Sequence, residues 1–210
     1  MHRSPAMNLI HRQILSHQTQ TAVISNKLRL TRPCDVFINH RSIDTKRTVA
    51  SLLYDQLRWL KLRPFLDKKS MKPGDKLFDK IDIAIKECKI GIAIFSPSYC
   101  QSYFCLHELA LMMELKKKVI PIFCDIKPSQ LTIVDNGNVP EKEVHRFNSA
   151  LEEAKYTVGL AFDSHKGNWS DVVTSAAEIV IDSLIELQEE KKKEHPIIPH
   201  QNTGFSPRTK

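Results

Sequence analysis

The feature that most constrains the fold is the regular alternation of short apolar runs and amphipathic segments from Cys34 to about Leu187. The apolar runs, which we expect to be strands, cover residues 34–39, 62–66, 90–95, 119–124 and 157–162. Segments with apolar residues at helical spacing separate these runs, and a last one covers residues 171–187. Strands and helices that alternate in this way form a parallel sheet covered on both faces, so the sequence predicts an α/β fold.

The strand order follows from the handedness of the connections. Right-handed crossovers favour a doubly wound sheet, and five strands fit the flavodoxin-like order 2-1-3-4-5. In this order the first and third strands are neighbours, and ligands bind in the crevice at their carboxyl ends. We therefore expect the loop 39–44 to meet the loop 96–102. The crevice should then hold Arg41 and the helix that carries Glu108.

Two local expectations concern the residues that flank this crevice. Asp44 is predicted to be the N-cap of a helix over residues 45–61. Ser96 and Ser98 are predicted to cap the helix that follows the third strand.

Glu108 is the candidate catalytic residue. On a helix its neighbours are Phe104 at i−4, Cys105 at i−3, Leu111 at i+3 and Met112 at i+4. A carboxylate in such company is partly desolvated, which raises its pKa and suits it to chemistry. The alternative is an ordinary glutamate on a helix surface.

The length of 210 residues fits one domain with tails. Residues 1–32 are expected to be a basic disordered extension, residues 33–188 the domain, and residues 189–210 a charged, proline-rich disordered tail. Much of the net charge of +7 lies at the two ends. This basic charge leaves weak attraction to nucleic acid open, but it is not accompanied by a motif that reads nucleic acid.

The cysteines favour a reducing compartment. There are five, an odd number, and none forms a Cys-x-x-Cys pair. We expect a cytoplasmic location, with the nucleus as a further one, while the acid-free basic N-terminus leaves plastid targeting as an alternative. The sequence predicts neither a membrane span nor a metal site, because its apolar runs are short and its nine histidines are scattered.

The first apolar run begins a series of family motifs. Residues 34–41, CDVFINHR, resemble the opening strand of plant Toll/interleukin-1 receptor (TIR) domains, usually written DVFLSFR. Further segments resemble the family in the same order: DTK 44–46, FLD 65–67, KPGD 72–75, SPSY 96–99, CLHEL 105–109, VIPIF 119–123 and KPS 127–129. The chain departs from the family pattern at Ser42-Ile43 (usually Gly-Glu), Lys46 (usually Arg) and Phe104 (usually Trp). The chain looks like a TIR-only protein.

The resemblance implies an enzyme that cleaves NAD+ to nicotinamide and ADP-ribose or cyclic ADP-ribose variants, as immune or cell-death signals. NAD+ is then the substrate, and no separate cofactor is implied. Glu108 of the Cys-Leu-x-Glu-Leu motif becomes the catalytic residue. The implied substrate contacts are Arg41, Ser42, Ile43, Asp44, Thr45, Lys46 and Gly74. Phe104 and Tyr99 are candidates for stacking on a base, or for packing in the core.

The resemblance also implies partners. TIR domains associate with copies of themselves and with other TIR proteins, so a homo-oligomer is expected. The polar, glycine-containing loop 67–75 either closes over a neighbouring molecule's crevice in a head-to-tail stack or acts as a lid on its own. The competing function is a non-enzymatic adaptor that acts by homotypic association.

Overall fold

The computed structural model describes residues 34–45, 47–133 and 139–194. The strands are β1 (Val36–His40), β2 (Pro64–Phe65), β3 (Ile90–Phe95), β4 (Lys118–Cys124) and β5 (Leu160–Phe162). The helices are α2 (Ser42–Thr45), α3 (Val49–Trp59), α4 (Asp67–Ser70), α5 (Leu77–Glu87), α6 (Tyr103–Glu114), α7 (Glu141–Lys155) and α8 (Trp169–Glu194), with the 3-10 turns η1 (Tyr99–Gln101) and η2 (Pro128–Gln130). The strands pair in the order β2-β1-β3-β4-β5, and every pair is parallel. The predicted flavodoxin-like sheet is confirmed.

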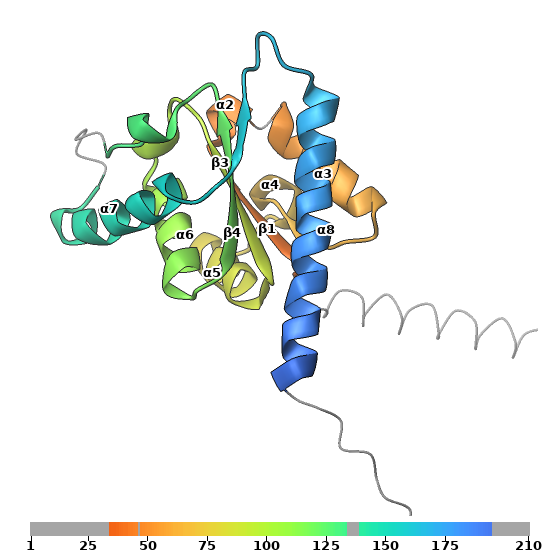
Figure 1. The fold of residues 1–210 in the computed structure, drawn as a ribbon. Helices are drawn as coiled ribbons and strands as arrows, with labels where there is room; N and C mark the ends of the chain where they lie inside the picture. The colour runs from red at the N-terminus through yellow and green to blue at the C-terminus, as the bar shows by residue number, and fades with distance from the viewer. Residues whose placement is uncertain (1–33, 46, 134–138, 195–210) are drawn as a thin grey trace, which may run out of the picture.

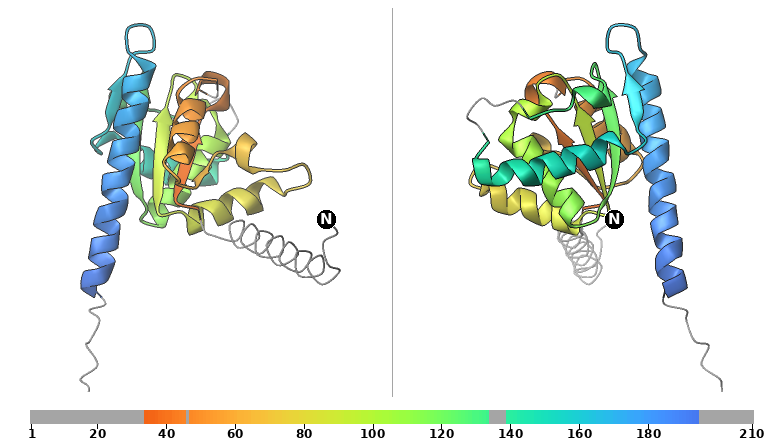
Figure 2. Two further views of the ribbon diagram at one scale, coloured as in Figure 1. Left: turned by 90° about the vertical axis from the view of Figure 1, so that its right-hand side faces the viewer. Right: turned by 60° about the vertical axis from the view of Figure 1, so that its left-hand side comes forward.

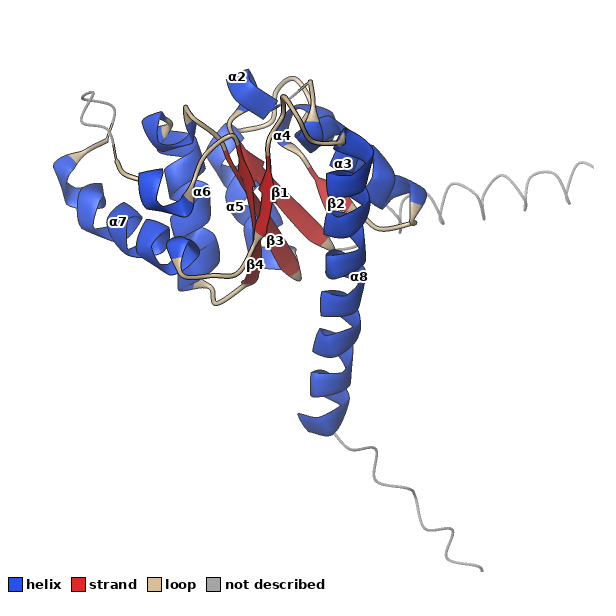
Figure 3. Ribbon diagram, turned by 45° about the horizontal axis from the view of Figure 1, so that its top comes forward, coloured by secondary structure: helices blue, strands red, loops and turns tan. Residues whose placement is uncertain are grey.

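Two cores lie on opposite faces of the sheet, because successive side chains of a strand point to opposite faces. Val36 and Ile38 of β1 belong to one core with α3 and α8. Phe37 of the same strand belongs to the other core, which α5, α6 and α7 cover. Helices therefore form a layer on each side of the sheet (Figures 1 and 3). The side chain of Asn39 shares the face of Phe37, which directs it toward α6.

The final helix is longer than the sequence predicted. It begins at Trp169 and continues through Glu194, so the predicted boundary at residue 188 falls inside it. Beyond the apolar face, Glu189 and Lys193 are spaced as an i,i+4 pair, and three lysines lie in the last turn, where cations favour a helix. Figure 2 shows α8 running along one side of the sheet and past its lower edge. No helix in the described ranges is long and apolar enough to cross a membrane.

The region after β1 also differs from its prediction. A short α2 comes first, and the long helix begins at Val49, with Thr48 at its N-cap position. Asp44 is therefore not the N-cap of α3, and that prediction is wrong. The extension 1–32 and residues 195–210 of the predicted tail lie outside the described residues.

An ion cluster around the buried Asp35 closes the amino-terminal end of the sheet. Asp35 accepts hydrogen bonds from Arg63 Nε at 2.8 Å and Nη2 at 2.7 Å, and Lys89 Nζ lies 3.1 Å from its Oδ1. Burial by itself raises the pKa of Asp35, but the hydrogen bonds from Arg63 and Lys89 outweigh it, and the pKa is lowered. The cluster ties the segment before β1 to the segments before β2 and β3.

Candidate functional site

Glu108 lies on α6, on the side that faces the sheet. Ser102 begins this helix, because its hydroxyl accepts a hydrogen bond from the Cys105 amide at 3.4 Å. The Glu108 side chain is buried, with 9% of its surface exposed. Burial raises the pKa of Glu108 to about 8, although a hydrogen bond from Asn39 opposes the rise. The charges of Asp67 and Asp82 raise it further.

Asn39, at the carboxyl end of β1, holds the Glu108 carboxylate. Its Nδ2 donates to Glu108 Oε2 at 2.7 Å and to the Cys105 carbonyl at 3.1 Å. The hydroxyl of Tyr99 donates to Asn39 Oδ1. Glu108 is thus linked through Asn39 to β1, and through Asn39 and Tyr99 to the segment that follows β3.

The loops after β1 and β3 meet, as the strand order predicted. Asp44 Oδ2 accepts one hydrogen bond from Ser96 Oγ at 2.7 Å and one from the Ser98 amide at 2.9 Å. These two serines therefore do not cap α6, a role that Ser102 takes instead. The carboxylate of Asp44 is occupied in joining the loops.

Thr45 supports the same loop from inside. It is 1% exposed, and its hydroxyl donates to the Arg41 carbonyl at 3.0 Å. A hydroxyl has one hydrogen, so Nδ1 of His40, 2.9 Å away, is the donor to Thr45 Oγ1. Ile43 is by contrast 78% exposed, and Lys46 lies outside the described residues. Thr45 and Asp44 fix the loop that carries Arg41 and Ser42.

Two polar atoms near the end of β1 are buried without a hydrogen-bond partner among the described residues. They are Nε2 of His40 and Nε of Arg41. Asp67 Oδ1 is 3.8 Å from His40 Nε2, an ion-pair distance that is too long for a hydrogen bond. A buried donor such as Arg41 Nε is costly to leave unpaired, which makes Arg41 a candidate for binding an anionic ligand.

Gly74 lies in the exposed loop between α4 and α5. Its φ is +95°, a conformation that glycine adopts without steric cost, and open space surrounds the position of an added Cβ. None of the contacts among the described residues links Gly74 to Glu108 or Arg41. The structure therefore brings Arg41 and Glu108 to the same end of the sheet and places Gly74 on a separate surface loop.

The two aromatic candidates have different environments. Tyr99 is fully buried, so its ring belongs to the core and is not available to stack on a base. Phe104 is 42% exposed and stacks on Phe78 of α5, with ring centroids 5.1 Å apart and planes 26° apart. Phe104 is therefore the aromatic that a ligand can reach.

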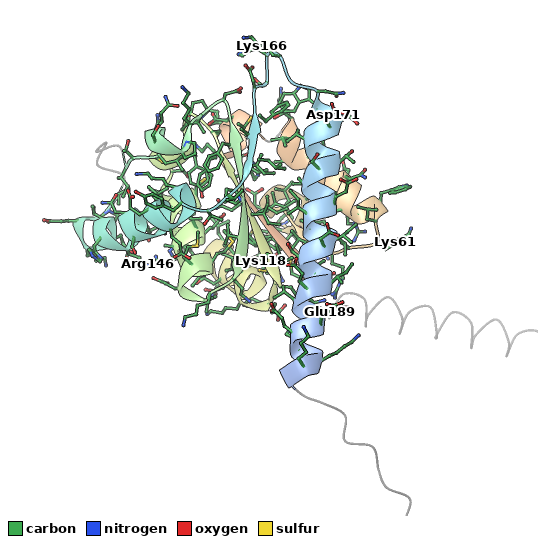
Figure 4. All side chains as sticks on the ribbon, viewed as in Figure 1. Lys61, Lys118, Arg146, Lys166, Asp171 and Glu189 are labelled. Atoms are coloured by element: carbon green, nitrogen blue, oxygen red, sulfur yellow. The ribbon has the colours of Figure 1, made fainter. Side chains whose placement is uncertain are left out.

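Two surface hollows lie away from Glu108. One of about 720 Å³ lies beside the carboxyl half of α8, where Lys118 pairs with Glu186 at 2.5 Å (Figure 4). Another of about 640 Å³ adjoins β4 and β5 and includes Asp125 and His165. In the described part of the chain, no group of three or more His, Cys, Asp or Glu side chains is placed to hold a metal ion.

Asn39, His40 and Asp67 were missed as site residues from the sequence. A signal was present: Asn39 and His40 are polar residues at the end of an apolar strand, where the family pattern has Ser and Phe. Asn39 is two residues beyond Phe37 and so on the same face of β1. Its contact with Glu108, however, depends on how α6 packs on that face.

Comparison with known proteins agrees with this architecture. The family model described as the TIR domain matches residues 34–194. A protein of Brachypodium distachyon named as a probable 2' cyclic ADP-D-ribose synthase is 48% identical over 168 residues, which cover 78% of this chain and 75% of that protein. The TMV resistance protein N of Nicotiana glutinosa is 38% identical over 101 residues, 46% of this chain but only 9% of that protein.

A solved structure supports the same assignment. The TIR domains of the activated Roq1 resistosome, which recognises the pathogen effector XopQ, match with a TM-score of 0.60 and 25% identity. The match covers 70% of this chain and 99% of that one. The family model spans nearly all of the described residues, and the grass relative is close to half identical over most of its length. This chain therefore belongs to the TIR domain family.

Proposed function

We propose that this protein cleaves NAD+ to nicotinamide and ADP-ribose or cyclic ADP-ribose variants, which serve as immune or cell-death signals. The observation that carries the proposal is the buried carboxylate of Glu108, anchored by Asn39 at the carboxyl end of β1. The likeness to the Brachypodium distachyon protein named as a probable 2' cyclic ADP-D-ribose synthase supports it.

The chemistry needs a negative charge near the ribose. Departure of nicotinamide leaves an oxocarbenium-like centre, as in glycoside hydrolysis, and a carboxylate beside the ribose stabilises that charge and orients the hydroxyls. In the free protein the pKa of Glu108 is raised to about 8, so the ionised form becomes dominant only above that pH. The cationic nicotinamide ring favours ionisation, because an opposite charge nearby lowers a carboxyl pKa.

Arg41 is our candidate for the pyrophosphate of NAD+. Its Nε is buried without a partner in the described residues, and it follows directly on β1. A guanidinium binds phosphate oxygens with directed N–H groups. The product depends on the nucleophile: a ribose hydroxyl of the same molecule gives a cyclic product, and water gives linear ADP-ribose.

Activity is proposed to require self-association. The Roq1 relative is a resistosome, an assembly in which TIR domains were solved together. In this chain Asp67, at the start of the segment 67–75, faces Glu108, but Gly74 has open space around the position of an added Cβ, which favours a contact of Gly74 with a second molecule. A head-to-tail contact of this kind uses two different surfaces and forms open rows. Other TIR proteins are further candidate partners.

The direct test incubates the purified full chain with NAD+ and follows nicotinamide by chromatography. Nicotinamide release should fall to background in Glu108→Gln and stay at the wild-type rate in Glu153→Gln. The second variant makes the same chemical change at an exposed residue of α7. If wild-type protein releases no nicotinamide at any protein concentration, the adaptor function replaces the enzymatic one.

A dilution series tests the requirement for assembly. Specific activity should rise with protein concentration, and a Gly74→Ala variant that melts cooperatively should lose this rise. A specific activity that is constant over a wide range of concentrations would show that a single molecule is active.

A further inference from the structure

Every polar atom of the Asn39 side chain is used inside the protein. The side chain is fully buried, its Nδ2 contacts Glu108 Oε2 at 2.7 Å and the Cys105 carbonyl at 3.1 Å, and its Oδ1 accepts from the Tyr99 hydroxyl. An amide has two N–H donors, and both of these are taken. A buried asparagine with so complete a set of partners has one stable orientation.

The Cys105 carbonyl and the Glu108 carboxylate determine that orientation, because both accept from Nδ2, whereas a hydroxyl such as that of Tyr99 can donate or accept. If the Asn39 amide were turned over, its oxygen would face a carbonyl and a carboxylate, which are both acceptors, and its NH2 group would face the hydroxyl. The observed orientation satisfies all of these groups at once. The buried Tyr99 ring packs against Phe95, with ring centroids 4.7 Å apart, so the core holds the Tyr99 hydroxyl in one position.

The carboxylate of Glu108 is in turn anchored through Asn39. A glutamate side chain has several rotatable bonds, and ordering it costs conformational entropy. Among the described residues, Asn39 donates the hydrogen bond that holds Oε2, and it does so from β1, an element different from the helix of Glu108. A hydrogen bond between elements fixes the carboxylate relative to the crevice as well as to α6.

We propose that Asn39 is a positioning residue, whose amide, held by the Cys105 carbonyl and the Tyr99 hydroxyl, fixes the Glu108 carboxylate in the geometry that NAD+ cleavage requires. This inference rests on the proposed function and adds a residue to it. Catalysis by a positioned group is sensitive to displacements of about 1 Å, which cost about a hundredfold in rate.

The same hydrogen bond favours the charged form of Glu108. The groups that face this carboxylate are Asp67 of α4, Asp82 of α5, and Tyr99 and Cys105 near the start of α6; the two aspartates raise its pKa while Asn39 lowers it. Removal of the Asn39 donor should move the pKa of Glu108 upward. Because the proposed reaction uses the ionised carboxylate, the pH–kcat profile should move to higher pH.

The experiment compares Asn39→Asp and Tyr99→Phe with wild type in kcat, KM and the pH dependence of kcat. Asn39→Asp keeps the shape of the side chain and removes the amide donors, but its new carboxyl group also raises the pKa of Glu108. Tyr99→Phe keeps the ring and adds no charge, so its pH profile separates the loss of positioning from the effect of charge. We expect kcat at pH 7 to fall between about tenfold and about a hundredfold in Asn39→Asp, with a smaller change in KM. The acidic limb of its pH profile should move up by about one pH unit. Tyr99→Phe should change both quantities in the same direction by less.

Asn148→Asp is the matched control, because it makes the same change on an exposed face of α7 and should leave the profile unchanged. The role of Asn39 would be overturned if Asn39→Asp and Tyr99→Phe both kept the wild-type kcat and the wild-type pH profile. If Glu108→Gln were inactive in the same experiment, the proposed function would still stand. Wild-type activity in Glu108→Gln would overturn the proposed function itself.

A stability measurement gives a readout that is independent of turnover. The free energy of unfolding is measured for Asn39→Ser, Glu108→Ala and the double variant at pH 9, because alanine, unlike glutamine, cannot accept the hydrogen bond from Asn39. Coupling between the two sites supports the anchoring contact, and additive effects would contradict it.

Discussion

The buried charge of Glu108 predicts a pH-dependent stability difference between wild type and Glu108→Gln. The pKa of Glu108 is raised from 4.5 to about 8 by burial, which means that the folded protein disfavours the ionised form. The unfolded chain ionises near pH 4.5, so the wild-type folded state loses stability as pH rises from there toward 8 and loses no more above that. Glutamine carries no charge at any pH and can still accept the hydrogen bond from Asn39.

The magnitude follows from the difference between 8 and 4.5, which is 3.5 pKa units. At about 1.36 kcal/mol per unit, the full penalty is about 4.8 kcal/mol, which we take as an upper value. Between pH 5 and pH 9 the unfolding free energy of Glu108→Gln should rise by about 4 kcal/mol relative to wild type. Only about 0.8 kcal/mol of the cost of ionising the buried Glu108 is present at pH 5. Any constant effect of the substitution cancels in this comparison.

Urea unfolding of both proteins at pH 5, 7 and 9 checks the prediction, and titration of every other group cancels in the difference between the two proteins. The slope of the unfolding free energy with urea should be the same for both, which guards against a change in the unfolded state. A difference in stability that stays constant between pH 5 and pH 9 would mean that Glu108 has an ordinary pKa, and the argument from burial would be wrong.

Other predictions concern parts of the fold away from the crevice. Asp35→Asn should lower the free energy of unfolding by about 3 kcal/mol at pH 7, because it leaves Arg63 without its buried partner, while the exposed Asp55→Asn should cost less than about 1 kcal/mol. The difference in unfolding free energy between Asp35→Asn and wild type should narrow as pH falls below 4, because the ion pairs of Asp35 stabilise the fold only while its carboxyl is ionised. Equal losses of unfolding free energy in Asp35→Asn and Asp55→Asn would refute the role of the Asp35 cluster. Gly159→Ala should cost about 2 kcal/mol or more, since its Cβ would lie 2.4 Å from the Pro121 carbonyl, whereas Gly74→Ala, strained but in open space, should cost about 1 kcal/mol. Thermal melts of both glycine variants decide between these values.

The sheet could be predicted from the sequence because its central strands are continuous apolar runs, which are typical of a parallel sheet covered on both faces. The meeting of two loops at the end of β1 and β3 followed from strand order alone. The identities of the residues in contact could not be predicted from the strand order. That Asn39 binds Glu108 depends on the depth and rotation of α6 against the sheet, which side-chain packing sets and periodicity does not encode. That Asp44 binds Ser96 depends on the conformations of the two loops, which periodicity does not encode either.

The length of α8 shows a different limit. Its last turns carry charged residues on every side, a composition that suits a disordered tail and an exposed helix equally well. The apolar face that nucleates the helix ends at Leu187, and the extension to Glu194 relies on helix propagation, which costs little once a helix has formed.

The course of α8 also has a practical consequence for attaching the protein to a support. The helix starts near the carboxyl ends of the strands and runs in the opposite direction, so its 26 residues span about 39 Å away from the crevice (Figure 1). A dye, bead or biosensor chip linked at Glu194 is therefore held at the far end of the molecule. Such a linkage leaves the carboxyl ends of the strands, where Glu108 and Arg41 lie, facing away from the support.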